Sequence, residues 1–187
     1  MFERDIISQL AAWKTDTNRK PLVVHGARQV GKTWTLKYFG REYFDDVAYF
    51  SLDKDESGLC DVFRTTKDPQ RIIQHLSFLH GKKIEPQTTL LILDEIQECN
   101  EALNALKYFC EEAPEYAVAC AGSLLGIYLN HVGKSFPVGK VNHLYMYPLT
   151  FTEFLRTKDP VMHEYMHSID KLSLIHISEP TRLALIS

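Results

Sequence analysis

Glycine, lysine and threonine at residues 26–33 have the composition and spacing of a phosphate-binding loop. The residues read GARQVGKT and match the pattern GxxxxGK[ST], known as Walker A. Gly26 and Gly31 allow the backbone to turn tightly and to bring its N–H groups close to phosphate oxygens. Lys32 can reach the β- and γ-phosphates of a nucleotide, and the Thr33 hydroxyl can bind Mg²⁺. The pattern therefore predicts a site for a nucleoside triphosphate with magnesium.

The sequence around this loop favours the same interpretation. An apolar run at residues 21–25 precedes the loop and a helical pattern follows Gly31, so the loop joins a buried strand to a helix. An accidental glycine-containing loop would not need this context. The residues expected to bind the nucleotide are Gly26, Ala27, Arg28, Gln29, Val30, Gly31, Lys32, Thr33 and Trp34.

Two carboxylates follow the apolar run at residues 90–93, at the end of another expected strand. In a phosphate-loop protein one acid here orders the Mg²⁺ shell, which suits Asp94. A second acid can polarise the attacking water as general base, which suits Glu95. Alternatively, both acids merely cap the next helix. Ser123 follows the strand at 117–121, and it either hydrogen-bonds the γ-phosphate or the attacking water or serves as a helix N-cap.

The elements that carry these residues alternate between short apolar runs and helical patterns. Strands that alternate with helices form βαβ units, so the expected fold is α/β, with a mostly parallel sheet covered by helices on both faces. A polar loop is expected at residues 53–60. The expected strands are 21–25, 47–52, 89–93, 117–121 and 141–147, and the expected helices are 3–14, the segment after Gly31, 68–81, 101–112, 151–157 and 161–170.

Composition places the chain among ordinary globular proteins and limits the classes of function. It has 187 residues, 45% of them hydrophobic and 24% charged, with a formal net charge of −3. This net charge gives the chain no overall positive field that would attract nucleic acid. The net charge does not rule out a local basic patch. The four cysteines form no CxxC pair, which favours reduced thiols over a zinc site or a disulfide framework. The sequence contains no signal peptide and no apolar run of membrane-spanning length, so a cytoplasmic protein without a membrane partner is expected.

Four segments together resemble bacterial and archaeal AAA-type ATPases whose members carry a C-terminal domain of unknown function. The segments are GARQVGKT, LLILDEIQ, ALKYFCEEAPEYAVACAGSLLG and FPVGKVNHLYMYPLTFTEFL, and the resemblance covers about residues 3–156. It implies ATP as the nucleotide and a three-layer P-loop fold with a five-stranded sheet of order 5-1-4-3-2. It also implies phosphate and Mg²⁺ roles for Lys32, Thr33 and Asp94, the second acidic position for Glu95 and the sensor role for Ser123.

The C-terminal end departs from this family. The segment KLSLIHISEPTRLALIS resembles translated adapter or vector sequence, so we expect native sequence to stop near Lys171 and the chain to be a truncated copy. The expected organisation is an N-terminal helix and linker at 1–20, an ATPase core at 21–171 and a non-native tail at 172–187. The arginines that are candidates to act in trans on a neighbouring subunit, or else are solvated surface charges, are Arg64, Arg71 and Arg156.

A second pattern, H-E-x-x-H, indicates different chemistry. On a helix, His163 and His167 would share a face and could bind zinc, with Glu164 as general base, as in a metallopeptidase. No plausible third ligand follows in native-looking sequence, and Glu179 lies in the segment expected to be non-native. We therefore interpret the pattern as a chance match on a short helix.

These observations predict an ATP-binding protein of AAA type with Mg²⁺-dependent ATP hydrolysis as its reaction. A nucleotide-gated interaction module with little turnover is the alternative, because sites of this class are often completed by a neighbouring subunit. The expected partners are copies of the chain, or a protein bound through the missing C-terminal domain. The sequence is compatible with three processes that hydrolysis would drive, namely DNA or RNA handling, protein remodelling and regulation of a partner.

Overall fold

The computed structural model describes residues 4–53, 58–123 and 139–177, and side chains up to residue 169. The chain divides into two compact units, which are described separately. The core unit is Ile6–Pro148, and the C-terminal unit combines Met1–Asp5 with Leu149–Ser187. The strands are β1 (Leu22–His25), β2 (Asp46–Ser51), β3 (Thr89–Asp94), β4 (Ala117–Gly122) and β5 (Asn142–Tyr145). The helices are α1 (Ile6–Thr15), α2 (Lys32–Tyr43), α3 (Leu59–Thr65), α4 (Pro69–His80), the short 3₁₀ helix η2 (Ile96–Glu98), α5 (Asn100–Glu112), α7 (Phe151–Lys158) and α8 (Pro160–Ile177).

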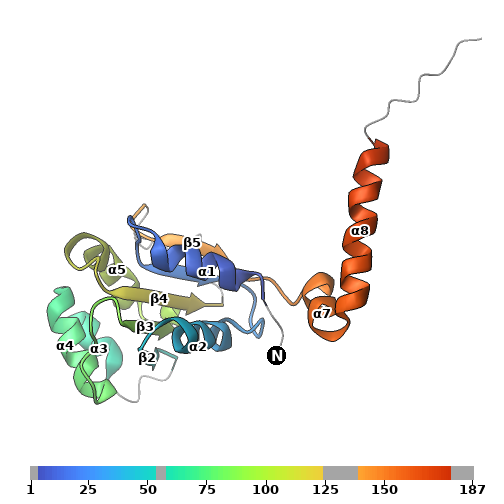
Figure 1. The fold of residues 1–187 in the computed structure, drawn as a ribbon. Helices are drawn as coiled ribbons and strands as arrows, with labels where there is room; N and C mark the ends of the chain where they lie inside the picture. Colours follow the sequence, from blue (N-terminus) through green and yellow to red (C-terminus); the bar gives the residue numbers. More distant parts are fainter. Residues whose placement is uncertain (1–3, 54–57, 124–138, 178–187) are drawn as a thin grey trace, which may run out of the picture. The chain divides into compact units, whose positions relative to one another are not determined.

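Five strands of the described residues form one sheet in the order β2-β3-β4-β1-β5 (Figure 1). Each neighbouring pair is parallel. Read from the opposite edge, this is the order 5-1-4-3-2, so the predicted fold class is confirmed. The central strands are buried at every residue, as strands covered on both faces must be.

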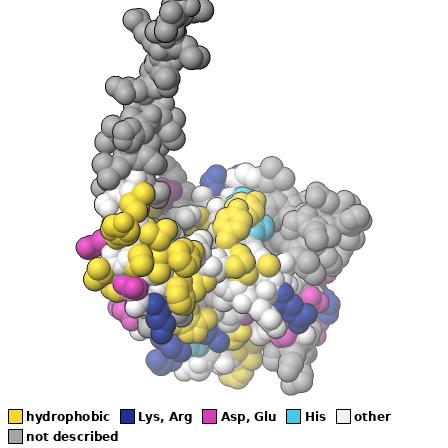
Figure 2. Space-filling model, turned by 90° about the vertical axis from the view of Figure 1, so that its right-hand side faces the viewer, with side chains coloured by type: hydrophobic (Ala, Val, Ile, Leu, Met, Phe, Trp, Pro, Cys, Tyr) yellow, Lys and Arg dark blue, Asp and Glu magenta, His cyan; other side chains and the backbone are white. Residues whose placement is uncertain are grey.

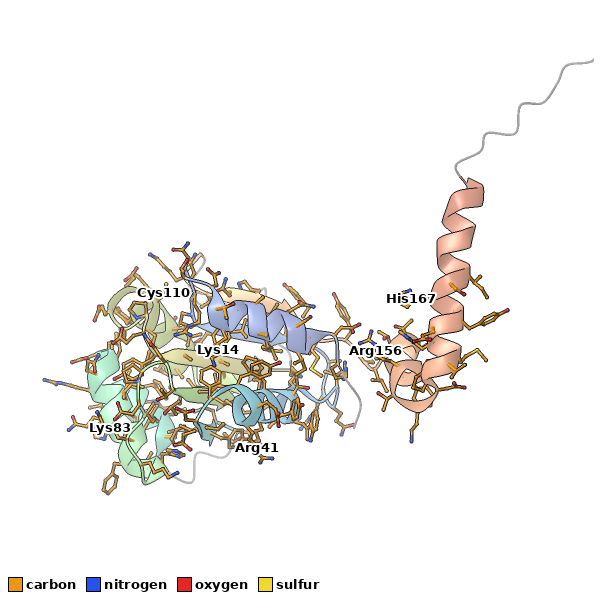
Figure 3. All side chains as sticks on the ribbon, in the orientation of Figure 1. Lys14, Arg41, Lys83, Cys110, Arg156 and His167 are labelled. Carbon is orange, nitrogen blue, oxygen red and sulfur yellow. The ribbon has the colours of Figure 1, made fainter. Side chains whose placement is uncertain are left out.

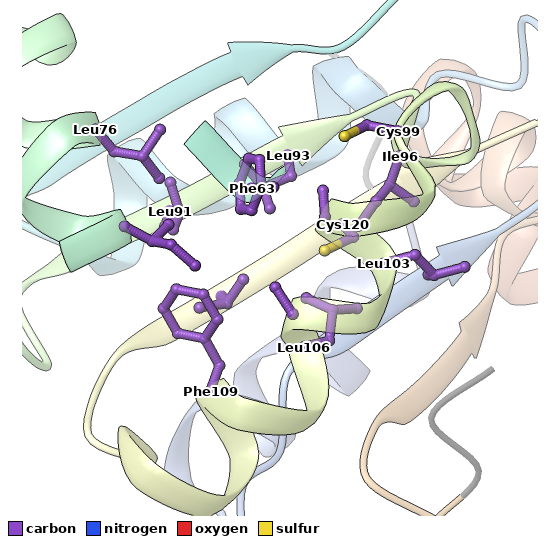
Figure 4. Packing of buried hydrophobic residues seen from close by; sticks show 14 of the residues in the cluster. Phe63, Leu76, Leu91, Leu93, Ile96, Cys99, Leu103, Leu106, Phe109 and Cys120 are labelled. Atoms are coloured by element: carbon purple, nitrogen blue, oxygen red, sulfur yellow. The ribbon is translucent and has the colours of Figure 1, made fainter. Parts of the chain in front are cut away.

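Helices cover both faces of this sheet and give the core unit three layers. Buried side chains of α1 and α2 pack on one face, against the residues of β1, β3 and β4 that point to that side. Buried side chains of α3, α4 and α5 pack on the other face. Figure 4 shows part of this second cluster, to which the helix residues Phe63, Leu106 and Phe109 and the strand residues Leu91, Leu93 and Cys120 belong. The two clusters hold the sheet rigid, so its carboxyl edge is a fixed platform for the loops that leave it.

Local signals explain where the helices of the core begin and end. Helix α4 starts after Asp68, whose side chain accepts a hydrogen bond from the backbone N–H of Gln70. Pro69 occupies the first turn, where its missing N–H costs nothing. The helix ends at Gly81, which has the left-handed φ of 76° that this position favours.

Two expectations about the elements were wrong. The region expected as a loop through residue 60 ends earlier, because α3 begins at Leu59 and buries Leu59, Cys60 and Phe63. Seven residues are too few to show a helical period in the sequence. Helix α8 extends to Ile177, past the expected end at residue 170. It therefore includes the start of the segment 172–187, whose remaining residues lie outside the described part of the chain.

The C-terminal unit is organised around the carboxylate of Glu153. A capping box joins Thr150 and Glu153 at the start of α7. Oε1 of Glu153 also accepts hydrogen bonds from Arg4 Nε at 3.1 Å and from the backbone N–H of Asp5 at 2.9 Å. Burial opposes the charged form, but these hydrogen bonds and the Arg4 charge hold the pKa of Glu153 below its ordinary value. The segment before α1 is thus attached to α7.

The surface carries mixed charges and exposed apolar side chains. Figure 2 shows hydrophobic side chains among Lys, Arg, Asp and Glu on the face toward the viewer. None of the helices in the described residues combines the length and apolar character that a membrane span requires. The exposed large apolar side chains of the C-terminal unit are Leu149, Phe151, Phe154, Val161, Met162, Tyr165 and Ile169.

Candidate functional site

The loops that follow three parallel strands meet at the carboxyl edge of the sheet. His25 at the end of β1 is paired with Gly122 at the end of β4. Asp94 at the end of β3 is paired with Ser51 at the end of β2. Because the strands are parallel, the loop after β1, the acids after β3 and the serine after β4 leave the sheet on the same side. The structure thereby assembles the three segments that the sequence marked.

Lys32 lies at the first position of α2 and folds back over the phosphate loop. Its Nζ donates to the backbone carbonyl oxygens of Gly26 and Ala27, at 2.9 and 2.7 Å. The side chain is only 6% exposed. Burial lowers the pKa of Lys32, and the charges of Asp94 and Glu95 oppose that shift. A buried ammonium group held only by carbonyl oxygens favours an anion nearby.

The glycines of the loop are required by close approach and by backbone conformation. A Cβ on Gly26 would stand 2.3 Å from the carbonyl oxygen of Met146, just after β5. That backbone is fixed, because the Met146 N–H donates to the carbonyl oxygen of His25 at 2.7 Å. Gly31 is left-handed, with φ 96°, and precedes α2. Gln29 also has a left-handed φ, 65°, which is uncommon for a residue with a side chain.

The hydroxyl of Thr33 and the carboxylate of Asp94 are in direct contact. Thr33 Oγ1 donates to Asp94 Oδ2 at 2.7 Å. The same oxygen accepts a hydrogen bond from the hydroxyl of Tyr49 on β2 at 3.0 Å. Burial, followed by the charge of Asp94 and this hydrogen bond, raises the pKa of Tyr49 to about 12, so the phenol stays protonated as a donor. Asp94 itself is only 5% exposed.

Glu95 is held in a strained conformation beside Ser123. It has φ 51° and ψ 46°, the left-handed region that costs a residue with a Cβ about 1 kcal/mol or more. Its Oε2 accepts hydrogen bonds from Ser123 Oγ at 3.3 Å and from Nε2 of the buried Gln97. Backbone strain of this kind is concentrated at functional sites, where the surrounding structure maintains it.

The capping alternative for the two acids has little support. Glu95 occupies the N-cap position of η2, yet its side chain makes no cap hydrogen bond. Oδ1 of Asp94 accepts from the Glu95 N–H at 3.1 Å, but its other oxygen is committed to Thr33 and Tyr49. The N-cap alternative for Ser123 depends on residues after it, which lie outside the described residues.

The remaining loop residues differ in exposure. Ala27, Arg28 and Gln29 are exposed, whereas Val30 is partly buried against the core. Trp34 is 51% exposed, and its ring stacks on that of Tyr38 one turn later, with 5.4 Å between centroids. The aromatic surface of Trp34 is therefore available to a ligand that enters the loop.

The other candidates from the sequence have contacts within their own helix or unit. His163 and His167 share a face of α8, with ring centroids 5.1 Å apart, but the described residues contain no group of three or more potential metal ligands. Arg64 pairs with Asp61 and Arg71 with Asp68, each on its own helix or cap. Arg156 pairs with Asp5 inside the C-terminal unit; Arg156 and His167 are labelled in Figure 3.

Three residues of the site were missed by the analysis of the sequence. Tyr49 on β2 donates a hydrogen bond to Asp94, and Gln97 donates one to Glu95. The backbone of Met146 lies against Gly26 of the phosphate loop. Gln97 follows the acidic pair closely, so its position in the chain could have suggested it. Nothing in the spacing marks Tyr49 or Met146, because strand register brings them to the site.

A parallel α/β sheet whose first strand leads through a glycine-rich loop into a helix defines a P-loop nucleotide-binding protein. Residues 18–155, most of the chain, match the family model described as AAA domain. The chain therefore belongs to the AAA domain family and has an ATP-binding core of that type.

The other comparisons add little to the family assignment. No curated protein matches the chain. Among solved structures, PCH-2 from C. elegans is similar with a TM-score of 0.45 and 14% sequence identity, over 96% of this chain and 49% of that one. The chain thus spans about half the length of that protein.

Proposed function

We propose that the chain binds ATP with Mg²⁺ and hydrolyses ATP. The observation that carries this proposal is the 2.7 Å hydrogen bond between Thr33 and Asp94, which joins the phosphate loop to the acidic end of β3. Oxygen atoms from a hydroxyl and a carboxylate are the donor set that Mg²⁺ prefers. Mg²⁺, when bound, would neutralise charge on the β- and γ-phosphates. Thr33 would bind the ion, and Asp94 would orient its hydration shell.

The other residues divide the remaining tasks. The phosphates would replace the carbonyl oxygens that now accept hydrogen bonds from Lys32, and a charge-assisted contact would result. Glu95 would act as general base on the attacking water, and Ser123 would orient that water or the γ-phosphate. Hydrogen bonds from Ser123 and Gln97 already fix the position of the Glu95 carboxylate.

The proposal is tested by nucleotide binding and phosphate release with Lys32→Ala. We expect the free energy of ATP binding to this variant to be weaker by about 3 kcal/mol, because a buried charge-assisted contact is removed. Lys107→Ala is a matched control, because Lys107 is an exposed lysine on α5. Calorimetry that gives Lys32→Ala the same ATP affinity as the parent and the control would exclude this site.

A nucleotide-gated module with little turnover is the second candidate. The observation that favours it is the hydrogen bonding of Glu95, since a carboxylate engaged by Gln97 and Ser123 is less free to accept a proton from water. In this case a neighbouring copy of the chain or another protein would complete the site. Tight ATP binding without phosphate release in a single-turnover experiment, at all chain concentrations, would favour this candidate. A release rate that rises with chain concentration would indicate assembly into an active oligomer.

A further inference from the structure

We propose that Tyr49 is a positioning residue for Asp94 and tunes the magnesium affinity of the nucleotide site. This inference rests on the proposed function. The two residues come from neighbouring strands, β2 and β3, and Tyr49 lies two positions before Ser51, the register partner of Asp94. Side chains two residues apart on a strand share a face, so the Tyr49 ring lies on the same side of the sheet as the Asp94 carboxylate.

The geometry shows how the carboxylate is fixed. Asp94 Oδ2 accepts hydrogen bonds from Tyr49 Oη at 3.0 Å and from Thr33 Oγ1 at 2.7 Å. Oδ1 accepts from the N–H of Glu95 at 3.1 Å. Three donors on two oxygens hold the carboxylate in one orientation. Thr33 is itself a proposed magnesium ligand, so its hydroxyl would turn toward the ion when the ion binds. The Tyr49 hydroxyl can keep its hydrogen bond to Asp94 in both states.

Helix α2 holds the tyrosine ring from the other side. Lys37 Nζ lies 3.2 Å from the centroid of the Tyr49 ring, a cation–π contact. Lys37 follows Thr33 by one helical turn, so a single rigid helix fixes both hydrogen-bond donors of Asp94 Oδ2. Tyr49 also lines a surface cavity of about 460 Å³ with Lys37, Arg41 and Asp46. The substitution Tyr49→Phe keeps the ring and removes only the hydroxyl that donates to Asp94.

Outer-shell partners of this kind have a measurable effect on metal binding. Mutation of an outer-shell partner in a metal site usually costs about 10–100-fold in metal affinity or activity. The effect of Tyr49 should therefore appear in the magnesium dependence of nucleotide binding and not in binding of the nucleotide without the ion. A merely structural role would weaken both.

The test compares Tyr49→Phe with the parent chain by titrating Mg²⁺ into the chain with ADP, a ligand that is not turned over. We expect the half-saturating Mg²⁺ concentration to rise about 10-fold. ADP affinity measured in EDTA should stay unchanged. Tyr43→Phe is the matched control, because Tyr43 lies on α2 and its ring stacks on Phe39. An unchanged Mg²⁺ midpoint in Tyr49→Phe, or an equal rise in the control, would overturn the inference.

A double-mutant cycle shows whether Tyr49 acts through Asp94. In an Asp94→Asn background, Tyr49→Phe should have no additional effect on the Mg²⁺ midpoint. An undiminished effect there would mean that Tyr49 acts by another route. If Tyr49→Phe does not fold, Lys37→Met tests the positioning of the Tyr49 ring, since it removes the cation–π contact and should raise the midpoint by about 2-fold.

The outcome also separates this inference from the proposed function. Loss of ADP binding in Lys32→Ala together with an unchanged midpoint in Tyr49→Phe would reject only the role of Tyr49. Normal ADP binding in Lys32→Ala would reject the proposed site itself.

Discussion

Thr33 Oγ1 donates a hydrogen bond to Asp94 Oδ2 at 2.7 Å, although the two residues are 61 positions apart in the chain. The contact links the start of α2 to the end of β3, and through Asp94 it also engages Tyr49 on β2. Three elements thereby converge on one carboxylate oxygen. This convergence gives the proposed site a geometry that the pattern of the phosphate loop alone does not provide.

Substitution of Glu95 should separate binding from chemistry. We expect Glu95→Gln to keep ATP affinity and to slow hydrolysis by about 100-fold or more, because a general base is lost while the phosphate contacts remain. Phosphate release and calorimetry measure the two quantities. Glu98→Gln is the control, since Glu98 is an exposed acid on the adjoining η2. Hydrolysis by Glu95→Gln at the parent rate would show that the base is a different group.

Fluorescence of Trp34 should report nucleotide binding. The chain has two tryptophans, and Trp34 is 51% exposed beside Thr33 whereas Trp13, on the buried face of α1, is 6% exposed. A nucleotide in the loop should shield Trp34 and lower its quenching by iodide. Trp34→Phe retains only the buried Trp13, so its emission should not respond to ATP. A response of equal size in Trp34→Phe would place the change elsewhere in the fold.

Stability should depend on pH through His25. Burial, and then the neighbouring His143, lowers the pKa of His25 to about 4 from an ordinary value of 6.5. The unfolded chain therefore takes up this proton at a higher pH than the folded chain does. The free energy of unfolding therefore has its full value with respect to His25 above about pH 6.5. It falls by up to about 3 kcal/mol as the pH decreases toward about 4.

Urea unfolding across this pH window measures that dependence. His25→Gln removes the titrating ring, so the variant should show a smaller decrease in the free energy of unfolding as the pH falls. The difference between the two chains isolates His25 from carboxylates that titrate in both. Parallel curves for the parent and His25→Gln would contradict the assignment.

Removal of the C-terminal segment should leave nucleotide binding intact. Every residue of the proposed site belongs to the core unit, Ile6–Pro148, which has its own packed clusters on both faces of the sheet. A chain that ends at Lys171 should therefore bind ATP with the same Kd as the full chain. Thermal unfolding monitors its fold in parallel. If the shortened chain loses ATP binding or unfolds, residues 172–187 contribute to the structure of the site.

The sequence by itself determined the phosphate loop and the class of fold. A glycine, lysine and threonine pattern between an apolar run and a helical pattern is local, so each part is visible in consecutive residues. The five strands were visible because short apolar runs alternate with helical patterns, a local signal of βαβ units. The order of the strands followed from resemblance, and the observed sheet confirmed it.

Only the tertiary structure decided which side chains meet at the carboxyl edge. The Tyr49–Asp94 hydrogen bond depends on the register between β2 and β3, and a slip of one residue would turn Tyr49 to the opposite face. The contact of Gly26 with Met146 depends on β5 pairing with β1 across more than 100 residues of chain. Register and long-range pairing arise from packing of the whole core, and a single sequence carries no local signal for either.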